Sequence, residues 1–267
     1  MKKVNFLSRN GENITISAVL NFPEGFDESK KYSAVVVSHP GGGVKEQTAG
    51  TYAKKLAEKG FVTIAYDASY QGESTGEPRQ LENPYIRTED VSGAIDYLTT
   101  LPYVDAERIG AMGICAGAGY TANAAINDRR IKAVGTVSAV NIGSMFRNGW
   151  DNNIKDADAI PALEAGSNAR TAEAGGAAII TIPLAPLRKE DAPNKELEEA
   201  WEYYHPISAV LEFDSVPPSM YSTIHGCKGT PNRKRTRAAM GARLRRNEPQ
   251  GHSGPGLRRT RKHVPPL

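Results

Sequence analysis

The chain has 267 residues, of which 39% are hydrophobic and 24% charged, and its formal net charge is +3. This length and apolar fraction suit one large α/β domain or two small ones, and the composition excludes a coiled coil, a collagen-like fibre and a disulfide scaffold. No apolar run reaches 18 residues, so we expect no membrane-spanning helix. Two cysteines without an export signal predict reduced thiols in a cytoplasmic protein.

The predicted elements begin with an antiparallel hairpin in residues 1–26, which turns at Gly11-Glu12-Asn13. Apolar periodicity then predicts helices that begin near residue 49, at Thr88 and at Ala116, the first of them closed by Gly60. The strands expected between these helices are 34–38, 61–66, 108–113 and 132–137. Such alternation predicts parallel strands joined by helical crossovers, hence a doubly wound, mostly parallel α/β sheet.

Ligands of such sheets bind at the carboxyl ends of the strands, so the chemistry is expected in the loops that leave those ends. From about residue 141 to 205 the pattern weakens into Ala- and Gly-rich sequence, which we interpret as a cap-like insertion. The α/β domain is expected to extend over residues 1–215.

Cys115 lies at the centre of Gly113-Ile114-Cys115-Ala116-Gly117, where a strand turns into a helix. This pattern is typical of a nucleophile elbow, with cysteine in place of serine. The flanking glycines leave room for the strand and helix to approach each other, and a helix N-terminus favours a thiolate. Because the thiolate is the nucleophile, we predict Cys115 as the catalytic nucleophile. The alternative interpretation is an inert buried thiol.

An acyl-transfer site also needs hydrogen-bond donors that hold the oxyanion. The backbone N–H of Ala116 is one predicted donor. The second is expected from Gly41 or Gly42 in the loop His39-Pro40-Gly41-Gly42-Gly43, because consecutive glycines let the backbone pass close to a bound carbonyl.

These two motifs, together with residues 67–74 and with 108–110 ahead of the elbow, resemble the α/β-hydrolase superfamily and within it dienelactone-hydrolase-like proteins. The resemblance covers about residues 1–145. It implies hydrolysis of a carboxylic ester-type bond (ester, thioester or lactone) in a small-molecule acyl substrate by a Cys–His–Asp triad, with no metal and no organic cofactor. Some dienelactone hydrolases place a carboxylate where this chain has Pro40, so lactone specificity does not carry over.

The carboxyl end departs from this resemblance, which implies two further apolar strands followed by an acid and a histidine. Residues 227–267 instead contain 12 of the 33 Lys and Arg residues and no aspartate, whereas residues 1–226 have a net charge of −8. We therefore predict a disordered basic tail over residues 216–267 and a sheet that is incomplete at its C-terminal strands. An unpaired sheet edge of this kind predicts poor solubility.

Two explanations of this tail stay open. We favour the hypothesis that the reading frame shifts between Tyr204 and Cys227, which translation of the other two frames would test. The less favoured explanation is a genuine tail that binds nucleic acid non-specifically through its arginines. His252 and His263 have the chain order of a catalytic base, but no strand is expected to position them.

Four residues close to the motifs have structural as well as functional interpretations. For His39 we favour a ring that holds the Gly-rich loop over a general base. Asp67, Glu73 and Ser74 are expected to shape their own loop. Tyr70 is predicted either to line the acyl pocket or to lie on the surface. A non-catalytic binding protein of the same fold is the rival function for the whole body.

Overall fold

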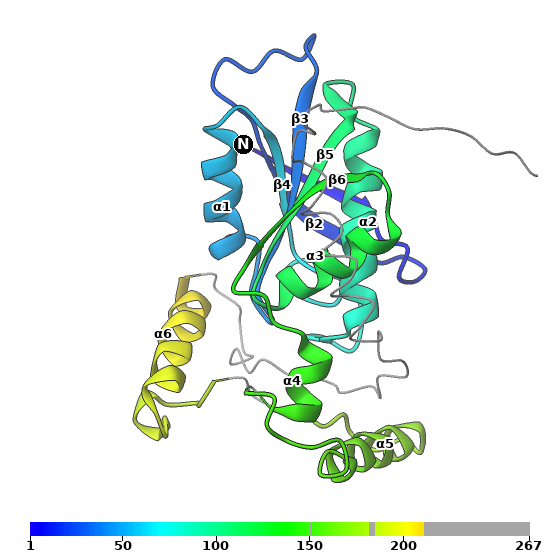
Figure 1. The fold of residues 1–267 in the computed structure, drawn as a ribbon, viewed down its shortest axis with the longest axis vertical. Coiled ribbons are helices and arrows are strands. Elements are labelled where there is room, and N and C mark those ends of the chain that lie inside the picture. The colour runs from blue at the N-terminus through cyan, green and yellow to red at the C-terminus, as the bar shows by residue number, and fades with distance from the viewer. Residues whose placement is uncertain (150, 182–184, 211–267) are drawn as a thin grey trace, which may run out of the picture. The chain divides into compact units, whose positions relative to one another are not determined.

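The computed structural model describes residues 1–149, 151–181 and 185–210 (Figure 1). The basic tail predicted at 216–267, with its expected disorder, its cysteine and its histidines, lies outside these residues. The same holds for His225 and for the proposed junction beyond residue 210.

Within the described residues, six strands form one sheet in the order β1-β2-β4-β3-β5-β6 (Figure 1). β2 pairs antiparallel with both β1 and β4, whereas β4, β3, β5 and β6 run parallel to one another. The strand bounds are β1 Lys2–Leu7, β2 Thr15–Asn21, β3 Tyr32–Ser38, β4 Val62–Tyr66, β5 Val104–Ile114 and β6 Ile131–Val137. The predicted hairpin and the mostly parallel α/β sheet are confirmed.

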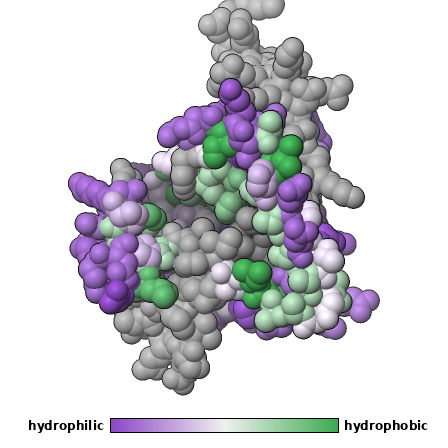
Figure 2. Space-filling view, turned by 90° about the horizontal axis from the view of Figure 1, so that it is seen from below, coloured by the Kyte–Doolittle hydropathy of each residue, from purple (hydrophilic) through white to green (hydrophobic). Residues whose placement is uncertain are grey.

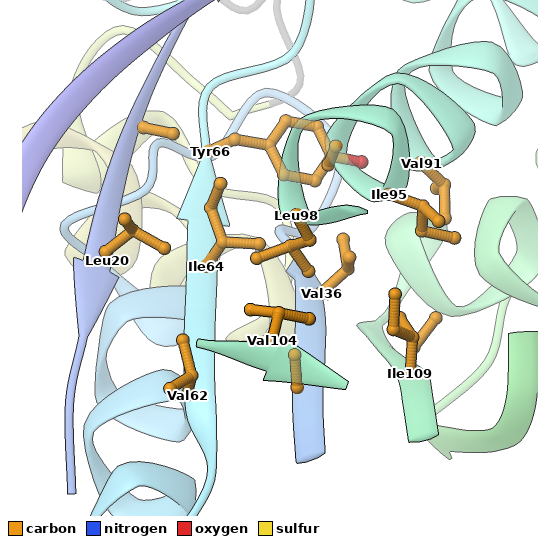
Figure 3. Packing of buried hydrophobic residues seen from close by; sticks show 14 of the residues in the cluster. Leu20, Val36, Val62, Ile64, Tyr66, Val91, Ile95, Leu98, Val104 and Ile109 are labelled. Carbon is orange, nitrogen blue, oxygen red and sulfur yellow. The ribbon is translucent and has the colours of Figure 1, made fainter. Parts of the chain in front are cut away.

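Helices cover both faces of this sheet: α1 (Thr48–Ala57) packs on one face, and α2 (Pro84–Thr99) and α3 (Ala116–Asn127) pack on the other. The larger core joins apolar side chains of α2 to those of the strands, as Leu98, Val36 and Ile64 show in Figure 3. These side chains are fully buried, and each contributes about 1.5–3 kcal/mol by leaving water.

The predicted start of α2 at Thr88 is wrong by one helical turn. The helix begins at Pro84, because the side chain of Asn83 accepts a hydrogen bond from the N–H of Tyr85 and Pro84 takes the first helical position. Thr88 lies inside the helix, where its hydroxyl donates to the carbonyl of Pro84. Gly60 has the expected left-handed backbone, with φ +96°, although α1 itself already ends at Ala57.

After β6 the described residues form helices and no further strand. The remaining elements are α4 (Ile142–Asn148), α5 (Ile160–Ala174), a short 3-10 helix (Lys189–Asp191) and α6 (Lys195–Val210). Neither α4 nor α5 contains a buried residue. The face seen in Figure 2 accordingly mixes exposed hydrophobic residues with hydrophilic ones. That this segment is a cap-like insertion stays a prediction.

β6 forms one edge of the sheet within the described residues. Residues 132–136 of β6 are exposed, and β6 is the last strand in the order among the described residues. None of the helices in the described part of the chain is long and apolar enough to cross a membrane.

Candidate active site

Cys115 lies at the sharp turn between β5 and α3, as the sequence predicts. Its backbone has φ +54° and ψ −119°, a conformation that is rare for a residue other than glycine. Two hydrogen bonds to the end of β6 and the loop after it hold it there: its N–H donates to the carbonyl of Val137 at 2.9 Å, and its carbonyl accepts from the N–H of Val140 at 3.1 Å. The side chain is half-buried. The strained turn is therefore built into the sheet and keeps the thiol partly accessible.

Two glycines make this turn possible by leaving space for backbone atoms. A Cβ atom at Gly117 would lie 2.5 Å from the carbonyl oxygen of His39, and one at Gly113 would lie 2.2 Å from that of Gly117. No side chain fits at such distances, so α3 can approach the ends of β3 and β5 only with glycine at both positions.

The Gly-rich loop after β3 lies beside the residue that follows Cys115. A Cβ atom built on Gly41 would be 3.6 Å from the Cβ of Ala116. Within the described residues, the N–H groups of Gly41, Gly42 and Ala116 donate no hydrogen bond, whereas the N–H of Gly43 donates to the carbonyl of Pro40 at 3.1 Å. The structure thus brings the predicted donor loop next to Ala116, and the three predicted amides have no hydrogen-bond acceptor in the described part of the chain.

His39 is the one histidine whose side chain the structure describes. Its ring is fully buried and both nitrogens are bonded: Nδ1 lies 2.7 Å from the carbonyl of Pro40, and Nε2 accepts from the N–H of Ala68 at 3.1 Å. These partners fix the proton on Nδ1. Burial, and then the nearby Arg87 guanidinium, hold the pKa of His39 well below its usual value of 6.5. His39 is therefore a neutral residue that holds the loop, as expected, and not a general base.

A buried ionic cluster under this loop went unnoticed in the sequence. Arg87 of α2 donates to the carbonyl of His39 at 2.8 Å and to the carboxylate of Glu82 at 3.0 Å. Glu82 also accepts from the hydroxyl of Tyr120 on α3 at 2.6 Å, and the Arg87 guanidinium lies 5.0 Å from the centre of the Tyr120 ring. The cluster ties the loop to both helices.

Two tyrosines of α6 also reach the loop region, and sequence reasoning missed both. The hydroxyl of Tyr204 donates to the carbonyl of Gly41 at 3.0 Å, and that of Tyr203 lies 2.7 Å from the hydroxyl of Thr48 at the start of α1. Burial raises the pKa of Tyr204, with smaller contributions from Tyr203 and from Cys115, so its hydroxyl stays protonated.

Residues 67–76 form a loop that is tied to β2, where the hydroxyl of Ser74 accepts from the N–H of Ser17 at 2.9 Å. Asp67 accepts from the N–H of Glu73 at 2.9 Å within this loop, as expected, and also from the N–H and the Nζ of Lys45 outside it, at 2.7 and 2.8 Å. The ring of Tyr70 lies against Gly76, where an added Cβ would come within 2.6 Å of it. The contacts that the structure gives for Tyr70 lie within residues 70–80 and do not connect it to Cys115. Among the described residues, no three His, Cys, Asp or Glu side chains gather closely enough to hold a metal ion.

Comparison with known proteins agrees with this geometry. Residues 16–139 match the model of the dienelactone hydrolase family. This stretch is dienelactone-hydrolase-like. The crystal structure of hypothetical protein PA2218 from Pseudomonas aeruginosa superimposes with a TM-score of 0.68 at 36% identity, over 76% of this chain and 62% of that one. The α/β-hydrolase fold of the described residues is thereby confirmed.

Two curated relatives are also similar. The uncharacterized protein YcjY of Escherichia coli K12 is 73% identical over 203 residues, which are 76% of this chain and 66% of YcjY. The thiohydrolase aneE of Aspergillus aculeatus is 31% identical over 114 residues, or 43% of this chain and 36% of that protein. The chain thus spans at most about two thirds of the length of these relatives.

Proposed function

We propose that this dienelactone-hydrolase-like protein is a hydrolase of carboxylic ester-type bonds that uses Cys115 as its nucleophile. The observation that carries the proposal is the left-handed backbone of Cys115, at φ +54°, on the turn from β5 to α3. This strained turn presents a half-buried thiol beside the amide of Ala116 and the Gly41–Gly42 loop. Strain of this kind is retained where the surrounding structure serves a function.

In the proposed reaction, the thiolate of Cys115 attacks the carbonyl carbon of the substrate, and a sulfur–carbon bond forms while the carbonyl electron pair moves onto oxygen. The N–H groups of Ala116 and of Gly41 or Gly42 stabilise that negative charge. When the carbonyl forms again, the bond to the leaving oxygen or sulfur breaks and the leaving group departs with its electron pair. Water then hydrolyses the acyl-enzyme and restores the thiol.

The base that would activate the thiol is not among the side chains that the structure describes, since both nitrogens of His39 are engaged with the backbone. We therefore expect acylation of Cys115 to be easier to observe than sustained turnover. Similarity to a protein named a thiohydrolase makes a thioester worth testing beside an oxygen ester. A small-molecule acyl compound is the proposed substrate class.

The test measures cleavage of p-nitrophenyl acetate and of an S-phenyl thioester by the full chain and by Cys115→Ala. We expect the variant to fall to the rate of the uncatalysed reaction, because no other described residue offers a nucleophile on this turn. Cys227→Ser is the matched control, since it removes the other cysteine of the sequence, and it is expected to keep the full rate. Equal rates for the full chain and Cys115→Ala would instead favour a non-catalytic binding protein.

A further inference from the structure

Three consecutive carbonyl groups of the Gly-rich loop each accept a hydrogen bond from a side chain. The carbonyl of His39 accepts from Arg87 at 2.8 Å, that of Pro40 from the ring of His39 at 2.7 Å, and that of Gly41 from the hydroxyl of Tyr204 at 3.0 Å. These donors come from α2, from the loop itself and from α6. A loop with three successive glycines is thus held through its carbonyls.

Holding a carbonyl also fixes the next amide. In a planar trans peptide the C=O of one residue and the N–H of the following residue belong to one rigid group and point in opposite directions. The bond to Pro40 therefore sets the direction of the N–H of Gly41, and the bond from Tyr204 to Gly41 sets the direction of the N–H of Gly42. These are the two loop amides that the proposed function assigns to the oxyanion.

Glycine makes such anchoring necessary. Gly42 has φ +56°, and residues without a Cβ exchange readily between conformations, so the loop has little conformational preference of its own. Preorganised donors stabilise an oxyanion because they need no reorganisation during the reaction. A peptide group that rotated freely would lose that advantage.

From this juxtaposition we propose that Tyr204 is a positioning residue for the oxyanion hole: its hydroxyl, carried by α6, holds the Gly41–Gly42 peptide so that the amide of Gly42 faces the bound carbonyl. The proposal rests on the proposed function of Cys115. Tyr203 has a different task, because its hydroxyl pairs with Thr48 and anchors α6 to α1. The adjacent tyrosines thus separate docking of the helix from orientation of the loop.

Two reactions of one thiol distinguish positioning from a general structural effect. Acylation by p-nitrophenyl acetate forms a carbon–sulfur bond through an oxyanion and releases p-nitrophenolate with its electron pair. Alkylation by iodoacetamide forms a carbon–sulfur bond by direct displacement of iodide and develops no oxyanion. Both rates are measured at Cys115 by mass spectrometry of its tryptic peptide, in the full chain, in Tyr204→Phe and in Tyr203→Phe. Release of p-nitrophenolate is measured for the full chain and for Cys115→Ala.

For Tyr204→Phe we expect acylation to slow about tenfold while alkylation stays within about twofold, a smaller loss than the 10²–10³-fold that follows removal of an oxyanion donor itself. Tyr203→Phe is expected to leave the ratio of the two rates unchanged. An unchanged ratio in Tyr204→Phe would overturn the positioning role, and so would an equal loss in both tyrosine variants. If p-nitrophenolate release is as fast from Cys115→Ala as from the full chain, the proposed function itself fails, and this result is distinct from the other two.

Discussion

The part of the chain up to β6 and the part after it differ in how they are held. Strands β1–β6 with helices α1–α3 bury two apolar clusters, one on each face of the sheet. In the following segment, α4 and α5 bury no residue, and hydrophobic side chains such as Ile160, Ile180 and Leu187 are exposed. The first region is therefore stabilised by its own apolar packing. The second region contacts the first through polar groups, such as the hydroxyls of Tyr203 and Tyr204, which bond to Thr48 and to Gly41.

This difference has a functional meaning, because the candidate site draws on both regions. The turn at Cys115 belongs to the first region with its packed core, and the hydroxyl that holds Gly41 comes from the second. Loss of order in the second region is expected to change how the site reacts before it changes whether the sheet folds.

The strongest test of the comparison removes one charge from each region. Arg87→Met leaves the carboxylate of Glu82 buried at 7% exposure without its cation, which is expected to cost about 3–5 kcal/mol of unfolding free energy. Lys189→Met breaks the ion pair with Glu202 on the exposed second region and is expected to leave the urea midpoint unchanged. Urea unfolding of both variants checks this, and similar midpoints for the two would contradict the distinction.

A smaller effect is expected when the same substitution is made in a helix of each region. Gly117→Ala in α3 would place a Cβ atom 2.5 Å from the backbone of His39, which is expected to cost about 3 kcal/mol because backbone cannot move aside cheaply. Gly143→Ala in α4 meets side-chain atoms alone, the end of the flexible Arg147 side chain at 3.1 Å and Oδ1 of Asn141 at 3.6 Å, and is expected to change stability by less than about 1 kcal/mol. Thermal unfolding of the two variants measures the contrast, which equal shifts in melting temperature would refute.

The sequence predicted well those elements whose structure is determined by residues close together in the chain. Apolar periodicity gave the strands and α3, and the glycines at 113 and 117 indicated the tight turn at Cys115 because their spacing has a steric meaning that needs no distant partner. The start of α2 could also have been found, since Asn83-Pro84 is a capping signal, but Thr88 offered a competing one.

What the sequence could not reveal depends on distant pairing. Tyr204 lies 163 positions from Gly41, and nothing in the pattern around either residue indicates that they meet. The burial of Arg87 was not predicted for a similar reason, since a charged residue in a helix is normally exposed. Its burial depends on contacts with Glu82 and Tyr120, which only the structure shows.

The smallest of the expected effects concerns the pH dependence of stability, which should originate in the first region. The carboxyl group of Asp90 is buried and accepts hydrogen bonds from the N–H and the hydroxyl of Ser69 and from Asn10. Burial is the largest cause and raises its pKa from 3.8 to about 6. Because the folded state then binds the proton more tightly than the unfolded state, the contribution of Asp90 to stability is greatest below pH 4 and is lost as the pH rises through 6.

Asp90→Asn removes this titration. We therefore expect the unfolding free energy of the full chain, relative to that of the variant, to fall by about 2 kcal/mol between pH 4 and pH 7. Asp191→Asn is the matched control in the second region, because Asp191 is exposed and pairs with Arg188 at the surface, where solvent screens the interaction. Urea unfolding at both pH values gives the two differences. A relative stability of Asp90→Asn that is constant or moves in the opposite direction would show that the buried carboxyl group does not govern the acid response of the sheet region.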